Sequence, residues 1–429
     1  MASLWIHGGR PLRGRVRAAG RKNSAVAVLP ATLLSDEPTR IDNLPDIADV
    51  VTMIDLIRAV GASVDVVGPG SVVVTPGSLH PNAAPRELAQ RMRASYYLLS
   101  ILLARCGEAD VPFPGGCAIG SRPIDQHLKG FRALGAEVDV VGGAVRARAV
   151  ALHGAHVYLD VTSVGATINL MLLASQAEGT TVIENAAKEP HVVDVATLLL
   201  AMGASIVGAG TDIIKVRGRE RLHGCQHAII PDEIEAATFM IAAAGTTGEV
   251  IVENVIPRHL EAVSAKLVEA GCQVDEDGEA VRVTARDRPL PVRLKTQPYP
   301  GFPTDAQQPM TSMLTIANGT STVTENVWED RFRFTEELRR MGAVIEVDGR
   351  TATVRGVPRL SGTCVQASDL RAGAALVVAG LIAEGVSEVQ GIEHLDRGYE
   401  QIAGKLQALG ARIDRRVEPF EVAAGADAE

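Results

Sequence analysis

The feature that most constrains the fold is a phrase that occurs six times along the chain. In each copy a helical pattern ends in glycine and a short β-branched pattern follows, as in AVGASVDVV and ALGAEVDVV. A glycine there is typical of the left-handed residue that ends a helix, and the β-branched residues after it favour a strand. The successive spacings are 74, 68, 68, 71 and 68 residues, which indicates internal duplication. The six glycines are Gly61, Gly135, Gly203, Gly271, Gly342 and Gly410.

A second helical pattern in each unit is rich in alanine and leucine. Several of these patterns end in glycine before another strand pattern, so each unit is predicted to alternate β-α-β-α-β, with room for one more strand. Helices as apolar as 372–382 must be buried, which places the sheets outside them. A solenoid is the competing architecture, but we find only six long units and no polar capping repeat. The second helices begin near Lys22, Arg93, Gly165, Glu235, Asp305 and Asp369.

We therefore predict an α/β protein with two pseudo-threefold domains of three units each, in which helices lie inside and sheets outside. A chain of 429 residues is long enough for two cores. Domain 1 is predicted to span 21–229. Domain 2 is predicted to be discontinuous, comprising 1–20 and 230–429, because the strand pattern at 4–7 can complete the last sheet. The final small and acidic residues, 423–429, are expected to fray.

Composition limits the classes of function. A net charge of −9 argues against general binding to nucleic acid or to an anionic membrane, so an anion site must be a local cationic pocket. Five scattered cysteines without a CxxC pattern favour a reducing cytosol and give no sign of a metal site. No apolar run reaches the roughly 20 residues needed to span a bilayer. Neither a P-loop nor a dinucleotide fingerprint is present. We expect a cytoplasmic protein without a cofactor.

A glycine-rich stretch, PGGCAIGSRP at 114–123, joins an apolar run to the helical pattern that starts near Ile124. It places Cys117 five residues before Arg122. A thiol on a glycine-rich loop beside an arginine is the setting in which a reactive, partly ionised cysteine is expected. The alternative is a surface turn with an inert cysteine.

Other unusual residues fall at equivalent places in the repeats, at the start of the apolar helix or in the loop after the next strand. Helix starts that converge about a pseudo-threefold axis make an anion site, which added cations strengthen. For a single arginine the alternative is a solvated surface charge. For Asp305, and equally for Asp369, it is an ordinary N-cap. Asp232 and Glu233 mark another helix start. The basic residues in question are Lys22, Arg93, Arg122, Arg331, Arg371 and Arg397.

These residues belong to segments by which the chain resembles the UDP-N-acetylglucosamine 1-carboxyvinyltransferase family of enolpyruvyl transferases, along nearly its whole length. That resemblance implies an inside-out α/β barrel built from two domains of three βαβαββ units. The Cys-containing loop separates the family from the sister family that acts on shikimate 3-phosphate. The matching segments are RKNSA (21–25), RMRAS (91–95), PGGCAIGSRPID (114–125), SVGAT (163–167), ENAAKEP (184–190), PGFPTDAQQP (300–309), WEDRF (328–332), SDLRAGAAL (368–376) and DRGYE (396–400).

The resemblance also implies the roles of the site residues. The phosphate of phosphoenolpyruvate would contact Lys22, Arg122 and Arg397, and its carboxylate side Arg331 and Arg371. The positive field would be completed by Arg93. The sugar 3′-hydroxyl would contact Asn23 and Asp305. The diphosphate would contact Ser163, Val164 and Gly165. The uridine would lie along Pro123, Ile124, Asp125, Gln126 and His127. Val327 completes the substrate-binding set. The catalytic residues would be Cys117 as general acid, with Asp305, Lys22, Arg397 and Asp369.

The implied reaction transfers the enolpyruvyl group of phosphoenolpyruvate to the 3′-hydroxyl of UDP-N-acetylglucosamine by addition and elimination, releasing phosphate. It is the first committed step of peptidoglycan synthesis, and it is blocked by fosfomycin. We expect a monomer with these two small-molecule substrates. One departure is Arg21, where the family has a small residue; its charge either alters local anion affinity or lies in solvent. The rival hypotheses are a transferase for another acceptor and a catalytically silent binding paralogue.

Overall fold

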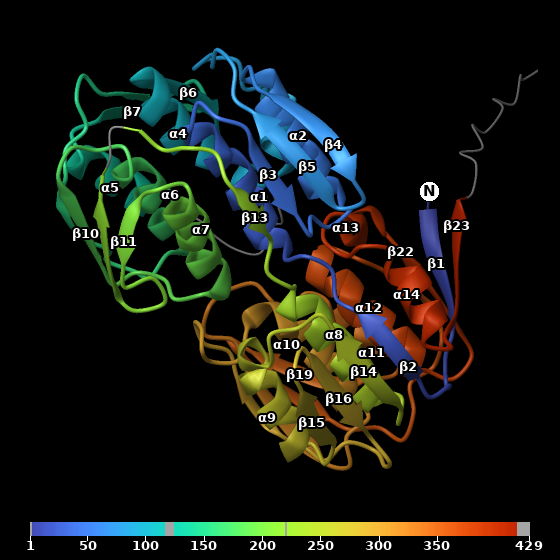
Figure 1. Cartoon of the computed structure of the whole chain (residues 1–429). Helices are drawn as coiled ribbons and strands as arrows, with labels where there is room; N and C mark the ends of the chain where they lie inside the picture. The colour runs from blue at the N-terminus through green and yellow to red at the C-terminus, as the bar shows by residue number, and fades with distance from the viewer. Residues whose placement is uncertain (1, 116–123, 219–220, 418–429) are drawn as a thin grey trace, which may run out of the picture.

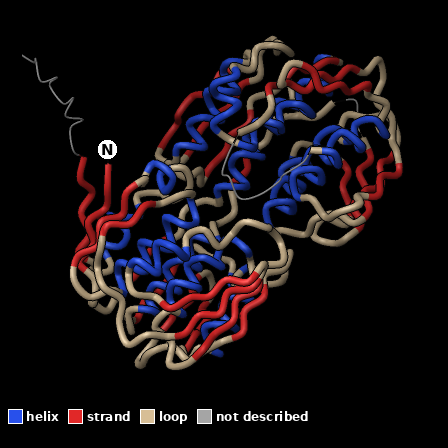
Figure 2. The backbone as a smooth tube through the Cα atoms, turned by 180° about the vertical axis from the view of Figure 1, so that it is seen from behind, coloured by secondary structure: helices blue, strands red, loops and turns tan. Residues whose placement is uncertain are grey.

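The chain folds into two lobes, each with helices in its interior and small sheets on its outer surface (Figures 1 and 2). The computed structural model describes residues 2–115, 124–218 and 221–417. Within these residues there are six sheets, one for each repeat: five have four strands and one has three. The predicted α/β class, with helices inside and sheets outside, is confirmed.

The first lobe, residues 22–229, contains three of the sheets. The inner helices are α1 (Lys22–Ala31), α4 (Tyr97–Cys106) and α6 (Val164–Ala174). The other helices of this lobe are α2 (Ala48–Ala59), α3 (Arg86–Arg91), α5 (Asp125–Ala133) and α7 (Pro190–Ala201), with the 3-10 turns η1 (Thr32–Leu34) and η2 (Arg93–Tyr96). The first sheet has the strand order β13 (Gln226–Ala228), β3 (Thr39–Asp42), β5 (Ser71–Thr75), β4 (Ser63–Gly68). The second sheet has the order β6 (Glu108–Pro112), β8 (Ala144–Arg148), β7 (Glu137–Val141). The third sheet has the order β11 (Ser205–Val207), β12 (Ile213–Arg217), β10 (Thr180–Glu184), β9 (His156–Tyr158).

The second lobe, residues 2–18 and 232–417, repeats this plan. Its inner helices are α8 (Glu233–Gly245), α10 (Thr304–Leu314) and α12 (Leu370–Ile382), joined by α9 (Glu261–Glu269), α11 (Thr335–Arg340), α13 (Glu393–Asp396), α14 (Ile402–Ala408) and η3 (Pro257–His259). One sheet has the strand order β15 (Gln273–Asp277), β16 (Ala280–Thr284), β14 (Glu249–Glu253), β2 (Arg13–Arg17). The next has the order β17 (Arg293–Lys295), β18 (Thr320–Thr324), β20 (Thr351–Arg355), β19 (Val344–Asp348). The last has the order β21 (Cys364–Gln366), β22 (Val386–Gln390), β1 (Ala2–His7), β23 (Arg412–Val417).

The six repeat glycines end helices as the sequence predicts. All have φ between +91° and +112°, and a strand begins two residues after each of them. A side chain with a Cβ would be strained in this left-handed conformation, which is why glycine marks the repeat so regularly.

Each lobe has its own hydrophobic core, built around its three inner helices. In the second lobe α8, α10 and α12 pack against one another, and the residues of α12 from Leu370 to Leu381 are buried. In the first lobe α4 packs against both α1 and α6. Because aromatic residues make up only 3% of the chain, small aliphatic side chains fill both cores, which lets the helices approach closely.

The chain crosses between the lobes twice, at 18–21 and 229–232, and the crossings run side by side. Gly20 and Pro231 form an antiparallel bridge, and the Arg21 amide donates a 2.7 Å hydrogen bond to the Ile230 carbonyl. The strand before each crossing pairs within the lobe that the chain is leaving. β2 precedes α1 but pairs with β14 of the second lobe, whereas β13 precedes α8 but pairs with β3 of the first lobe. The first helix of each lobe therefore starts from this paired connection.

The N-terminal strand completes the last sheet, as predicted. β1 is antiparallel to β22 on one side and to β23 on the other, with Trp5 opposite Glu388 and Asp414. Across the parts of the chain that the structure describes, no helix has both the length and the apolar character to cross a membrane.

Candidate active site

The first charged cluster joins the two lobes. Lys22 opens α1, Asp49 lies in the first turn of α2, and Arg397 follows α13 in the other lobe. One Asp49 oxygen lies 2.8 Å from Lys22 Nζ, and the other accepts a 2.9 Å hydrogen bond from Arg397 Nε. Burial alone would raise the pKa of Asp49, but Lys22 and Arg397 hold it below its usual range. Two cations predicted to bind phosphate are thus brought together around one buried carboxylate.

The second cluster lies within the second lobe. Arg331 Nη2 donates a 2.7 Å hydrogen bond to one oxygen of Asp305, and Arg371 Nη2 donates a 3.0 Å bond to the other. Both guanidinium groups are buried, whereas the Asp305 side chain is 25% exposed. Against the effect of burial, the two arginines hold the pKa of Asp305 well below its usual range. Asp305 is therefore an ion-paired carboxylate, and the N-cap alternative is wrong, because Pro303 occupies that position.

Helix capping falls instead to two other aspartates. Asp369 accepts hydrogen bonds from the Arg371 and Ala372 amides at the start of α12. Asp232 caps α8 in the same way, and its second oxygen accepts a 3.0 Å bond from the Lys22 amide. The predicted helix start at Asp232 and Glu233 is confirmed. Asp369 thus caps the helix that carries Arg371 and so fixes the position from which that guanidinium reaches Asp305.

Arg21 is buried, so the hypothesis that it lies in solvent is wrong. Its guanidinium forms an ion pair with Glu233, and both side chains are less than 10% exposed. Arg21 ends the first crossing between the lobes, and Glu233 opens α8 directly after the second. Burial lowers the pKa of Arg21, and the nearby acids Asp232 and Asp305 oppose that shift. Arg21 is therefore part of the connection between the lobes.

A third group of predicted residues lies within the first lobe, at the start of α6. A Cβ on Gly165 would lie 2.2 Å from the Tyr96 hydroxyl and 2.9 Å from His127 Nε2, so only glycine fits there. Tyr96 makes an edge contact with the His127 ring, and Arg93 lies over the face of Tyr96. Burial, followed by the charge of Arg93, lowers the pKa of His127 to about 3, so this ring is neutral at physiological pH.

The remaining predicted residues surround these groups. Ser163 caps α6 by accepting a bond from the Ala166 amide, and Gln126 connects α5 to Asp160 through both ends of its amide. The Val327 amide donates to Glu325. The other members of the set are Asn23 in the first turn of α1, Ile124 and Asp125 at the start of α5, and Val164 as the first residue of α6.

The chain matches the family described as EPSP synthase (3-phosphoshikimate 1-carboxyvinyltransferase) over residues 6–406. It is 57% identical over 416 residues to a UDP-N-acetylglucosamine 1-carboxyvinyltransferase 3 of Caldanaerobacter subterraneus, covering 97% of this chain and 99% of that protein. It is 54% identical to a UDP-N-acetylglucosamine 1-carboxyvinyltransferase 2 of Bacillus cereus, with 97% of each chain covered. The chain belongs to the UDP-N-acetylglucosamine 1-carboxyvinyltransferase family.

Solved structures agree with an enolpyruvyl transferase fold. The enolpyruvyl transferase NikO from Streptomyces tendae superimposes with a TM-score of 0.88 at 29% identity, covering 97% of this chain and 99% of that one. An EPSP synthase from Acinetobacter baumannii gives a TM-score of 0.77 at 17% identity, covering 97% and 100% of the two chains, which supports the fold alone.

Three residues that the family resemblance places in the carboxyvinyltransferase site lie outside the described residues: Cys117, Arg122 and Pro123. The described chain stops at Gly115, whose amide donates a 3.4 Å bond to Ala89, and resumes at Ile124. The roles expected for these three residues stay predictions.

Sequence reasoning missed several titratable residues in or near these charged clusters. Asp49 looks like any first-turn acid, and only the fold brings Arg397 to it. Glu189 and His191 open α7, and burial is the main cause that raises the pKa of Glu189 and lowers that of His191. Arg21 acts on both groups electrostatically. The run ENAAKEPH held the only signal, an acid and a histidine flanking the helix-starting Pro190.

Proposed function

We propose that this chain transfers the enolpyruvyl group of phosphoenolpyruvate to the 3′-hydroxyl of UDP-N-acetylglucosamine, releasing phosphate, as a step of peptidoglycan synthesis. The observation that carries the proposal is the pair of charged clusters, Lys22–Asp49–Arg397 and Arg331–Asp305–Arg371. Each offers two cations to an anion, and phosphoenolpyruvate carries two anionic groups. Relatives that share more than half of their residues with this chain are named for this reaction.

The proposed chemistry needs an acid and a base on opposite sides of the reacting carbon. The sugar oxygen bonds to C2 of phosphoenolpyruvate and gives up its proton, while C3 gains a proton, forming a tetrahedral phospho-ketal. The C2–O bond to phosphate then breaks with its electron pair, and C3 loses a proton to restore the double bond. Lys22 and Arg397 would neutralise the phosphate as it departs, and Cys117 would supply the proton.

In the proposed site Asp305 handles the hydroxyl proton. A carboxylate paired with two arginines is a weak base, because the pairing favours its ionised form. When the carboxylate of phosphoenolpyruvate takes over hydrogen bonds from Arg331 and Arg371, that stabilisation decreases and Asp305 becomes more basic. Substrate binding would thereby prepare the base for its task.

The lobes would act as two domains with boundaries near residues 21 and 230, closing on the nucleotide sugar and excluding water. Ser163, Val164 and Gly165 would hold the diphosphate, and residues 123–127 would lie along the uridine. We place the protein in the cytoplasm as a monomer that needs no cofactor.

The decisive experiment is release of inorganic phosphate from phosphoenolpyruvate. Release is expected with UDP-N-acetylglucosamine and not with shikimate 3-phosphate, which would be the acceptor of the alternative transferase. A product mass increased by one enolpyruvyl group identifies the transfer. If no acceptor supports release, the chain is a binding paralogue and the proposal is wrong.

A further inference from the structure

The carboxylate of Asp49 pairs with the side chains of both predicted phosphate-binding cations in the first cluster. It contacts Lys22 of its own lobe and Arg397 of the other, and the Asp49 side chain is 7% exposed. A buried acid placed between two cations fixes both of them, since each direction of movement breaks a charge-assisted hydrogen bond. The Asp49 carboxylate is therefore in a position to align cations that come from separate lobes.

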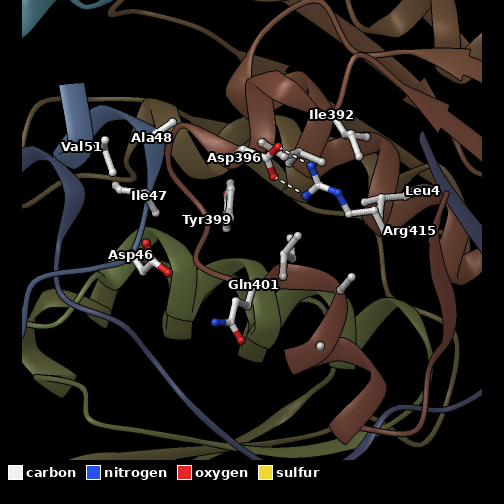
Figure 3. Close-up of a pocket in the computed structure, with 14 residues that line it drawn as sticks. Leu4, Asp46, Ile47, Ala48, Val51, Ile392, Asp396, Tyr399, Gln401 and Arg415 are labelled. Carbon is white, nitrogen blue, oxygen red and sulfur yellow. Dashed lines mark hydrogen bonds and ion pairs between the residues drawn. The ribbon is translucent and has the colours of Figure 1, made fainter. Parts of the chain in front are cut away.

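The surroundings of Asp49 show that this alignment depends on polar contacts. Beside α2 a partly open pocket of about 440 Å³ lies between the lobes. In Figure 3 the side chains of Ile47 and Val51 face Leu4, Ile392 and Arg415 across it. With this gap beside them, the lobes cannot rely on continuous apolar packing to hold their spacing here.

Two other contacts cross at the same corner. The Asp46 amide donates a 2.8 Å hydrogen bond to Glu400 of the second lobe. Next to Arg397, a Cβ on Gly398 would lie 3.1 Å from the Cδ of Lys22, so the backbone after Arg397 lies directly against the lysine stem. The Asp49–Arg397 pair is thus part of a close polar contact between lobes.

We infer that Asp49 is a positioning residue, which holds Lys22 and Arg397 in register across the lobes and shares them with the phosphate group of the substrate. This inference rests on the proposed function, because the phosphate role of both cations belongs to it. The three side chains carry a net charge of +1 together. The phosphate group would bind two cations that Asp49 already holds in position, but it would compete with the Asp49 carboxylate for their hydrogen bonds.

The inference predicts an unusual combination of effects for Asp49→Asn. Asparagine keeps the shape of the side chain but raises the charge of the cluster to +2, so a phosphate anion is attracted more strongly. The same change removes the ionic pairing that aligns the cations, so turnover falls. A residue needed only for packing would produce the opposite effect on phosphate, since loosening the site weakens every ligand.

The test compares wild type with Asp49→Asn in two measurements, steady-state turnover and the dissociation constant of inorganic phosphate measured calorimetrically with UDP-N-acetylglucosamine present. We expect kcat to fall about tenfold or more and phosphate to bind about threefold tighter or more. Asp49→Glu, which keeps the charge but moves it, should lower kcat and leave phosphate affinity within about twofold of wild type. Thermal unfolding confirms that each variant is folded.

A matched control is Asp55→Asn on the same helix, where the acid is 45% exposed and lies 3.7 Å from Arg58. It should change neither measurement. Unchanged kcat in Asp49→Asn, or phosphate binding that is weaker or unchanged, would overturn the inference. Failure of the proposed function gives a different result, because wild type itself would then release no phosphate with this acceptor.

Discussion

Asp305 and Arg371 occupy the same position in neighbouring repeats, the second residue of an inner helix, and they face each other across a 3.0 Å hydrogen bond. The repeat therefore places groups of opposite charge at matching helix starts, where they converge. The duplication that builds the scaffold also builds the site, because equivalent positions about a pseudo-threefold axis meet at one end of a lobe.

Replacing Asp305 with asparagine should lower turnover by roughly 10²–10⁴-fold, the usual contribution of a positioned acid or base. The helix start should persist, since Asp305 does not cap α10. Steady-state kinetics with both substrates measures the effect. Asp330→Asn, which removes a partly exposed acid nearby, serves as the control. Turnover near the wild-type value in a folded Asp305→Asn protein would move the proton-transfer role to another group.

The buried pair Arg21–Glu233 should make a strongly coupled contribution to folding. Removing one partner leaves the other charge buried, so Arg21→Met or Glu233→Met alone should lower the free energy of unfolding by about 3–5 kcal/mol. The double variant should recover much of this loss. Chemical denaturation of the four proteins in a double-mutant cycle gives the coupling free energy. Additive losses would show that the two side chains do not depend on each other.

Glu235 should make stability fall as pH rises. Burial, only partly offset by Lys405, raises the pKa of this carboxyl from 4.5 to about 7. The folded protein therefore keeps the proton to higher pH than the unfolded chain, and the resulting stability is lost as pH rises from 4.5 to about 7. Relative to Glu235→Gln, wild type should lose about 3 kcal/mol over this interval. Denaturation curves at several pH values test this, with the exposed Glu269→Gln as control.

An anionic electrophile such as fosfomycin should label Cys117 ahead of the other cysteines. Burial raises the pKa of Cys106, Cys225 and Cys364, and that of Cys272 to about 11, so each holds little thiolate near neutral pH. UDP-N-acetylglucosamine should accelerate the labelling.

Peptide mass mapping after this treatment locates the adduct, and Cys117→Ser should abolish it. Cys117→Asp, which keeps an acid at that point, should resist the reagent and retain some turnover. Equal labelling of the exposed Cys364 would show that Cys117 has no special reactivity.

Local patterns were enough to predict the architecture. The helix-ending glycines and the strands after them are encoded within a few residues, so Gly61 or Gly410 can be interpreted without knowing what lies nearby in space. The strand at residues 4–7 was also placed correctly, because the last repeat lacked one strand.

Pairings between distant residues escaped prediction. Asp49 meets Arg397 and Arg21 meets Glu233 only after both lobes have formed, and their sequence neighbourhoods resemble ordinary helix starts. The N-cap alternative for Asp305 stays open from the sequence for the same reason: its partners, Arg331 and Arg371, are supplied by two later segments of the chain.

The place of β1 between β22 and β23 has a consequence for the order of assembly. During synthesis from the N-terminus, the first strand emerges long before either neighbour exists, whereas every strand of the first lobe becomes available once residue 228 has been made. The lobe in the middle of the sequence can therefore fold first. The opening strand must wait, unpaired at both edges, until nearly the whole chain has left the ribosome.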